Sequence, residues 1–135
     1  LRLGYVLSEN DTLIEKVRNS GQPWSVSVPA QLAGSAALQN TYFIIKTAEF
    51  VSAERKFLID NLNNMNLKVF PSEANFIMFK SEIIKLDILL KSEDIAIRNC
   101  ENYEGLERGF YRIAVRTRKE NQYLISAMER CLENG

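Results

Sequence analysis

The apolar residues of this chain follow two different periods, and the change between them falls near residue 66. From residue 40 to residue 65, apolar side chains recur at steps of three and four, which predicts one long helix over 40–65. Arg55 interrupts its apolar stripe. At 1.5 Å of rise per residue, such a helix is roughly 35–40 Å long. That length is more than a small domain needs and is typical of a helix that bridges two domains.

The residues before this helix predict one strand and two shorter helices. Alternating apolar positions over 1–7 are typical of a β-strand. Polar capping residues at 8–11 and a stop at Gly21 bound a short amphipathic helix, and a connector containing Pro23 follows over 22–26. Small residues over 27–38, with Pro29 in the first turn, predict a second helix that can pack closely against its neighbours. We expect residues 1–40 to be the end of a larger domain.

After residue 66 the pattern predicts a small sheet with covering helices. Strands are expected over 67–70, 74–79, 95–98 and 111–116, and a polar loop over 99–109. Helices are expected over 82–90 and 118–132. The predicted fold class is therefore α/β with an α+β small domain over 41–135. In that domain the long helix precedes a small mixed or antiparallel sheet covered by helices.

Composition and charge exclude several classes of function. The chain has 17 basic and 17 acidic side chains, so its net charge is zero and no overall basic field is available to bind nucleic acid. The absence of histidine excludes a histidine-based triad and a histidine-ligated zinc site. Cys100 and Cys131 are too few for a four-cysteine metal site and are expected to be free thiols. No apolar run is long enough to span a bilayer. Taken together, these features predict a cytoplasmic protein with no metal, membrane or nucleic-acid partner.

Arginines carry most of the chemical information. Every basic residue from 98 to 118 is an arginine, whose planar fork can donate two parallel hydrogen bonds to a carboxylate or a phosphate. In the strand 110–116, a period of two places the apolar residues on one face and Arg112, Ala114 and Arg116 on the other. Ala114 leaves room beside Arg112 for a small anion. Four residues of a strand span about 13 Å, so Arg112 and Arg116 cannot both bind one carboxylate. We expect one to bind substrate and the other to pair with a surface carboxylate.

Five short segments resemble fold-type I pyridoxal-phosphate enzymes of the class I/II aminotransferase family. Residues 1–5 (LRLGY) are similar to the segment that follows the Schiff-base lysine, and residues 110–117 (FYRIAVRT) to the strand that carries the substrate arginine. The segments 22–26, 72–76 and 97–106 also occur in the family's order. Together they cover the whole chain. The resemblance implies the C-terminal part of the pyridoxal-phosphate-dependent transferase fold, with residues 1–40 closing the large cofactor-binding domain. It also implies pyridoxal 5′-phosphate as cofactor of the full-length enzyme, and a homodimer.

Within the family, two groups of enzymes are most similar. The connector 23–26 (PWSV) and the ending 110–118 resemble the threonine-phosphate decarboxylases of cobamide biosynthesis. Histidinol-phosphate aminotransferases tend toward a Tyr-Asn-Val connector and a Thr-Val-Gly version of the last strand. The resemblance therefore implies an L-threonine O-3-phosphate decarboxylase. The alternative is a histidinol-phosphate aminotransferase or a related class I/II aminotransferase.

The resemblance also implies roles for individual residues. Arg2 is similar to the arginine that holds the cofactor's phosphate, and Arg112 to the one that binds the substrate's α-carboxylate. Arg98 resembles a second substrate-anion ligand suited to a phosphate ester. A phosphorylated amino acid carries two anions, which two arginines on different strands can receive. Asn75 either lines the entrance of the substrate site or satisfies a turn.

No catalytic residue is expected in this chain. The family's Schiff-base lysine lies upstream of the position of residue 1, so we expect a C-terminal fragment that has no activity alone. Two alternatives belong to other classes of function. One is a stand-alone module whose arginine strand binds an acidic ligand; the other, a nucleic-acid binder, conflicts with the zero net charge. Trp24, Tyr5 and Tyr111 are expected to be packing residues.

Overall fold

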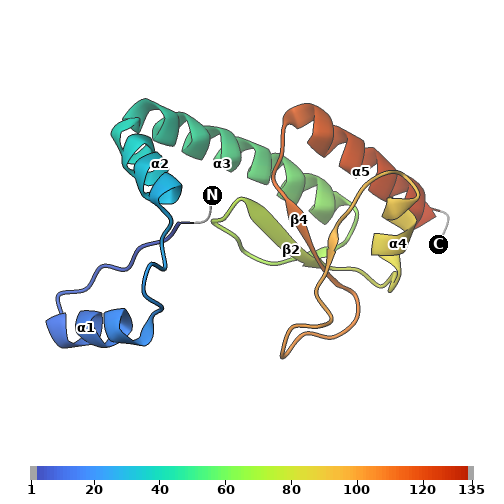
Figure 1. Ribbon diagram of the computed structural model, residues 1–135. Coiled ribbons are helices and arrows are strands. Elements are labelled where there is room, and N and C mark those ends of the chain that lie inside the picture. Colours follow the sequence, from blue (N-terminus) through green and yellow to red (C-terminus); the bar gives the residue numbers. More distant parts are fainter. Residues whose placement is uncertain (1–2, 134–135) are drawn as a thin grey trace. The chain divides into compact units, whose positions relative to one another are not determined.

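The computed structural model describes residues 3–133 and divides the chain into two compact units, residues 1–46 and 47–135. The boundary lies inside the long helix α3 (Thr41–Asn64), which confirms the helix predicted over 40–65 (Figure 1). Asn40 caps its start, where the side-chain oxygen accepts a hydrogen bond from Phe43 N at 3.1 Å. At its end Asn66 takes a left-handed φ of 57°, and Leu67 N donates to Leu62 O. Within residues 3–133 no helix has the length and apolar character needed to cross a membrane.

The first unit holds both of the short helices that the sequence predicts. Helix α1 (Asp11–Ser20) begins after Asn10, whose side chain accepts a hydrogen bond from Leu13 N at 3.0 Å, and ends at Gly21. Helix α2 (Val28–Gln39) carries Pro29 in its first turn. The Leu3 side chain packs closely against this helix at Gly34, where an added Cβ atom would collide with it.

Two expectations for the first unit are wrong. The strand predicted over 1–7 is not formed by residues 3–7, which are irregular and exposed. A strand needs a partner for its backbone groups, and the strands of the described residues all lie in the second unit. Tyr5 and Trp24 are not packing residues, since they are 78% and 97% exposed. Trp24 also adopts a positive φ of 61°, which is rare for a bulky residue.

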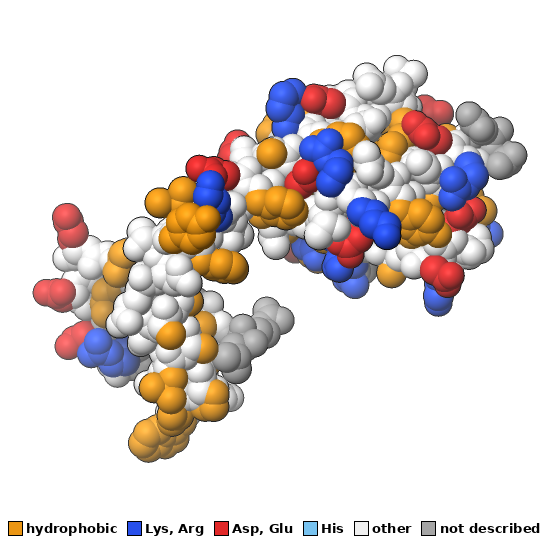
Figure 2. Space-filling view, turned by 90° about the horizontal axis from the view of Figure 1, so that it is seen from above, with side chains coloured by type: hydrophobic (Ala, Val, Ile, Leu, Met, Phe, Trp, Pro, Cys, Tyr) orange, Lys and Arg blue, Asp and Glu red, His pale blue; other side chains and the backbone are white. Residues whose placement is uncertain are grey.

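The surface of the first unit is rich in apolar side chains. Among its described residues only Ala30 is fully buried. Hydrophobic side chains gather on the surface over this unit in Figure 2. The exposed large residues include Leu32 and Leu38 of α2 and Tyr42 and Phe43 at the start of α3. A single helix-rich segment of this size therefore buries little of its own apolar surface.

The second unit is a four-stranded sheet with the strand order β1-β2-β4-β3. The strands are β1 (Lys68–Val69), β2 (Phe76–Lys80), β3 (Arg98–Asn99) and β4 (Phe110–Ala114). All three pairings are antiparallel, so the predicted fold class is confirmed and the sheet has no parallel pair among the described residues. The edge strand β3 begins three residues later than the predicted strand over 95–98 and extends into the predicted loop, because only Arg98 and Asn99 have partners on β4.

One face of this sheet is covered by helices and contains the core. In Figure 1, α5 (Arg118–Glu133) and the second half of α3 lie along the same side of the sheet. Tyr111 and Ile113 of β4 alternate with Arg112, which confirms the two predicted faces of that strand. The buried core cluster consists of Leu58, Leu62, Ile77, Phe79, Leu86, Leu90, Tyr111, Ile113, Leu124, Ile125, Ala127 and Met128.

Helix α4 (Leu86–Lys91) is shorter than the predicted helix over 82–90, and a buried hydroxyl explains why. Tyr111 Oη accepts a hydrogen bond from Leu86 N at 3.2 Å and donates to Ile84 O at 2.5 Å. Burial raises the pKa of Tyr111, and the nearby carboxylates of Asp87 and Glu101 raise it further, so the phenol stays protonated and can donate. These bonds hold the segment before Leu86 in a non-helical path against the sheet.

Candidate anion-binding site

Two arginines lie directly opposite each other on neighbouring strands of the second unit. The register of β3 and β4 makes Arg98 and Arg112 Cα partners. Directly opposed residues of an antiparallel pair have Cβ atoms about 4.5–5.5 Å apart and project from the same face. That face is the one turned away from the helices, since the neighbouring Tyr111 and Ile113 point into the core. The fold therefore brings together two residues that are 14 positions apart in the sequence.

Each of these guanidinium groups is stacked on an aromatic ring. The Cζ atom of Arg112 lies 4.8 Å from the centroid of Phe76, and that of Arg98 lies 5.6 Å from the centroid of Tyr103. Arg98 also donates a hydrogen bond from a terminal nitrogen to Asn102 Oδ1 at 3.1 Å. Rings and an amide orient the two cations without neutralising them. Their planar donor edges stay available to a ligand.

Neither arginine forms an ion pair with a carboxylate of the described residues. The other arginines of the second unit each pair with a glutamate, namely Arg55 with Glu73, Arg108 with Glu101, Arg116 with Glu120, Arg118 with Glu54 and Arg130 with Glu93. Like charges directly opposed on a sheet destabilise it. An anion bound between Arg98 and Arg112 would remove that repulsion.

A cavity opens beside Arg112 on the same face. It has a volume of about 230 Å³, and Arg112, Phe76 and Tyr103 contribute to its wall. The rest of the wall is mostly apolar, with Phe70, Pro71, Met78 and Leu106. Water is therefore partly excluded from one side of the guanidinium, which strengthens its interaction with an anion.

Arg116 does not take part in this site, as the spacing along the strand predicts. Its side chain pairs with Glu120 at 2.6 Å, the surface carboxylate expected for one of the two arginines. Glu120 also accepts hydrogen bonds from the backbone and the hydroxyl of Thr117. The bond from Arg116, followed by those from Thr117, lowers the pKa of Glu120 to about 2. Arg116 is consequently a structural residue at the start of α5.

The remaining predicted site residues are more distant or cannot be placed. Arg2 lies outside the described residues. Asn75 is exposed, and its backbone oxygen accepts a hydrogen bond from Val115 N at 2.8 Å just beyond the ends of β2 and β4. Its side chain does not line the cavity beside Arg112. Sequence reasoning missed both rings, because the register of β2 and β4 brings Phe76 under Arg112 and the fold of the β3–β4 connection brings Tyr103 under Arg98.

A family model for "Aminotransferase class I and II" matches residues 1–128 of the chain. The chain belongs to the class I and II aminotransferase family. This confirms the family that the short motifs resemble. Enzymes of this family depend on pyridoxal 5′-phosphate.

Individual members of the family are similar over nearly the whole chain. Threonine-phosphate decarboxylase from Salmonella typhimurium is 33% identical over 98% of this chain and 37% of its own length. Histidinol-phosphate aminotransferase from Sulfurisphaera tokodaii is 31% identical over 99% of this chain and 35% of its own length. The crystal structure of histidinol-phosphate aminotransferase from Clostridium acetobutylicum superposes with a TM-score of 0.84 and 31% identity, over 95% of this chain and 40% of that one. The chain thus spans well under half the length of these class I and II family members.

Arg98 and Arg112 are the described residues whose chemistry suits an anion near a pyridoxal-phosphate site. Arg112 lies at the apolar cavity, Arg98 faces it from β3, and neither is paired with a carboxylate of the described residues, so both could hold anionic groups of a ligand. Arg2, the residue that the motif resemblance assigns to the cofactor's phosphate, is not among the described residues.

Proposed function

We propose that this chain is the substrate-recognising part of a pyridoxal-phosphate-dependent enzyme that acts on a phosphorylated amino acid. The reaction proposed is decarboxylation of L-threonine O-3-phosphate in cobamide biosynthesis. The observation that carries this proposal is the pair of facing arginines, Arg98 and Arg112, which has no carboxylate partner in the described residues. The family membership of the chain supplies the class of chemistry.

The substrate of such an enzyme carries two anionic groups on a short carbon skeleton. Arg112 would bind the α-carboxylate with the two parallel donors of its fork, and Arg98 would bind the phosphate ester with the donors that Asn102 leaves free. The guanidinium groups start from facing Cα positions and lie over different rings, Phe76 and Tyr103. They can therefore receive two anions a few ångströms apart. Binding at two points fixes the orientation of the substrate's Cα atom.

Bound pyridoxal phosphate supplies the electron withdrawal that allows a bond at the substrate's Cα to break. The residues of this chain decide how the substrate is presented. Arg98 and Arg112 would hold its anions. The apolar wall beside Arg112 keeps water from one side of that guanidinium group. A decarboxylase and an aminotransferase can share these groups and differ in the pose that they impose.

A histidinol-phosphate aminotransferase is the second candidate. In its favour, the relative from Sulfurisphaera tokodaii and the crystal structure from Clostridium acetobutylicum both carry that name. In favour of the decarboxylase are the connector 23–26 (PWSV), the ending of the last strand, and the similarity to the Salmonella enzyme over 98% of the chain. We give the decarboxylase first place on these grounds.

Further properties of the whole enzyme belong to the same proposal. The chain spans 37% of the Salmonella decarboxylase, and we propose that it needs the remainder of such an enzyme for activity. Arg2 would contact the cofactor's phosphate, Asn75 would line the entrance, and the Schiff-base lysine would come from a segment outside this chain. We also propose a cytoplasmic homodimer, with residues 1–40 closing its cofactor domain.

An assay on the complete enzyme separates the two candidate reactions. The enzyme is incubated with L-threonine O-3-phosphate while released carbon dioxide is measured, and in parallel with histidinol phosphate and 2-oxoglutarate while glutamate is measured. We expect carbon dioxide release and no glutamate. Glutamate without carbon dioxide would assign the aminotransferase, and neither product would reject both. The 135-residue chain with added cofactor should release no carbon dioxide.

A further inference from the structure

Two consecutive residues of α3, Glu54 and Arg55, each reach a different segment of the second unit. Arg55 interrupts the apolar stripe of α3, and Glu54 beside it is only 6% exposed. A buried carboxylate on a packed helix is stable only when it is paired and hydrogen-bonded. Both side chains are fully engaged, and the groups that they hold flank the strands of the anion-binding site.

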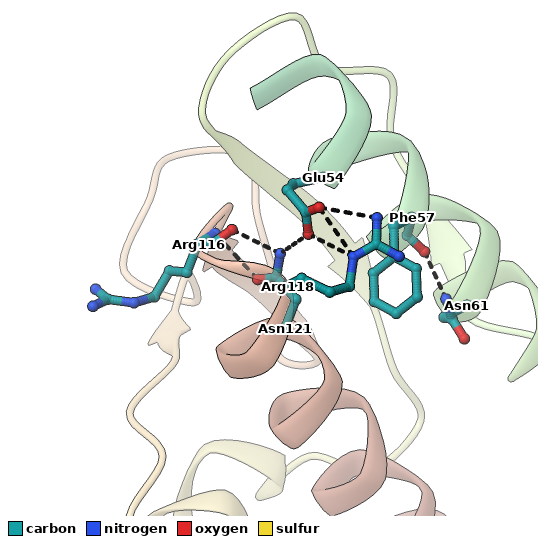
Figure 3. Close-up of polar contacts among 6 residues, drawn as sticks. All are labelled: Glu54, Phe57, Asn61, Arg116, Arg118 and Asn121. Carbon is teal, nitrogen blue, oxygen red and sulfur yellow. Dashed lines mark hydrogen bonds and ion pairs between the residues drawn. The ribbon is translucent and has the colours of Figure 1, made fainter. Parts of the chain in front are cut away.

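Glu54 is held by two residues of α5. Arg118 donates from Nε to Oε1 at 3.0 Å and from a terminal nitrogen to the same oxygen at 2.9 Å, while its guanidinium lies 4.0 Å from the ring of Phe57. Asn121 donates from Nδ2 to Oε2 at 2.9 Å. The bonds from Arg118 lower the pKa of Glu54 in spite of its burial, so the carboxylate stays charged. Figure 3 shows these groups converging from α3 and α5.

Asn121 connects Glu54 to the backbone that follows β4. Its Nδ2 atom donates to Arg116 O at 2.8 Å, and its Oδ1 atom accepts from Arg116 N at 3.1 Å. One side-chain amide thereby satisfies both backbone groups of a residue that follows β4 (Phe110–Ala114) by two positions. In Figure 3 the Arg116 side chain points away from Glu54, so the contact is to its backbone alone. The exit of the strand that carries Arg112 is therefore tied to α3.

Arg55 ties the neighbouring strand to the same helix. Its side chain is only 13% exposed. It donates hydrogen bonds to Glu73 O and Ala74 O, both at 3.2 Å. These carbonyls belong to the turn before β2, where Phe76 is the cross-strand partner of Ala114. Phe76 carries the ring under Arg112. Two successive side chains of one helix thus fix the strand of Arg112 and the strand of its aromatic support.

We propose that Glu54 and Arg55 are positioning residues for the Arg112 guanidinium, and this inference rests on the anion-binding role proposed above. Glu54 acts through Asn121 on the exit of β4. Arg55 acts through the turn 72–76 on Phe76. Neither touches the bound anion. Loss of the Glu54 contact lets β4 shift, and loss of the Arg55 contact lets β2 shift. Either shift misaligns the Arg112 guanidinium, and its two parallel hydrogen bonds to an anion weaken quickly with misalignment.

The proposal is tested by titrating the 135-residue chain with the proposed substrate, L-threonine O-3-phosphate (O-phospho-L-threonine). The Nε–Hε signal of Arg112 is followed by NMR. Glu54→Gln removes the charge that orders Arg118 and Asn121. We expect the dissociation constant to rise about tenfold, which corresponds to one impaired charge-assisted hydrogen bond. Glu54→Asp keeps the charge with a shorter reach and should recover part of the affinity.

Matched controls separate positioning from general stability. Glu93→Gln breaks another ion pair of α5, the one with Arg130. It should lower the melting temperature without weakening the binding. Arg55→Met is paired with Lys56→Met, which removes only the exposed bond to Asp60. Only Arg55→Met should weaken binding, and it tests the proposal even if Glu54→Gln does not fold.

The outcomes distinguish this proposal from the proposed function. Unchanged binding by Glu54→Gln and Arg55→Met, or an equal loss in the controls, would overturn the positioning role while leaving the site intact. If the wild-type chain does not bind O-phospho-L-threonine, the anion-binding role fails. Amide exchange at Val115 and Arg116 then decides separately whether Glu54 anchors the exit of β4, since exchange should be faster in Glu54→Gln and unchanged in Glu93→Gln.

Discussion

Arg98 and Arg112 face each other across β3 and β4 as direct Cα partners, with no carboxylate of the described residues paired to either. Two like charges in this position weaken a strand pair. Aromatic rings and an asparagine support the guanidinium groups but leave their charge uncompensated. Such an arrangement is costly for stability and suited to binding anions. We therefore propose this face of the sheet as the anion-binding face of the second unit.

The first prediction compares the two arginines of β4 and its exit. Arg112→Lys should weaken binding of O-phospho-L-threonine at least about tenfold, because lysine keeps the charge but lacks the two-donor fork. Arg116→Lys should change the affinity by less than about twofold, since Arg116 is engaged with Glu120. Isothermal titration of both variants checks this. Equal losses in the two variants would contradict the site.

The second prediction concerns stability at acid pH. The pKa of Glu120 is lowered from its ordinary value of 4.5 to about 2, first by the hydrogen bond from Arg116 and then by those from Thr117. Because the folded state binds fewer protons than the unfolded state in this range, the contribution is present above pH 4.5 and is lost as the pH falls toward 2. The melting temperature should drop over this interval, and less steeply in Glu120→Gln.

The third prediction tests the buried hydroxyl that shortens α4. Tyr111→Phe leaves Leu86 N without its partner in the core and should cost about 1–3 kcal/mol of unfolding free energy. Tyr123→Phe removes a single exposed bond to Glu93 O and should cost less than about 1 kcal/mol. Urea denaturation followed by circular dichroism measures both. Tryptophan fluorescence is unsuitable, because the sole tryptophan, Trp24, is exposed and lies in the first unit.

The fourth prediction uses two glycines of the β3–β4 connection with similar backbone angles. Gly109 has φ +90°, and a Cβ atom there would lie 2.5 Å from Ser81 O, which is backbone and cannot move aside. Gly105 has φ +81° with open space around it. Gly105→Ala should cost about 1–2 kcal/mol from backbone strain alone, and Gly109→Ala clearly more. Equal unfolding free energies of the two variants would contradict the close contact.

Local patterns predicted the elements and faces that depend only on neighbouring residues. The three-and-four spacing over 40–65 predicts α3, and the alternation over 110–116 places Arg112 opposite the core. Capping residues place α1 between Asn10 and Gly21. The short motifs predicted the family, and the match of the family model to residues 1–128 confirms it. These features follow from backbone geometry within one or two turns of chain.

The failures share a different cause. The alternation over 1–7 has the period of a strand, yet no described strand is available to pair with residues 3–7. Trp24 is apolar but no core lies beside it, so it is exposed. The first turn of the predicted helix over 82–90 is displaced by a hydroxyl from Tyr111, more than 20 residues later. In each case the local preference is decided by the tertiary contacts that the described residues make.

The sequence by itself determined which residues could bind an anion, because arginine chemistry and strand alternation are local properties. Only the tertiary structure decided that Arg98 meets Arg112, that Phe76 and Tyr103 lie beneath them, and that Glu54 anchors Asn121, 67 residues away. Strand register and long-range ion pairs depend on the path of the whole chain. That path is selected by burying one common core, and no short window of sequence contains it.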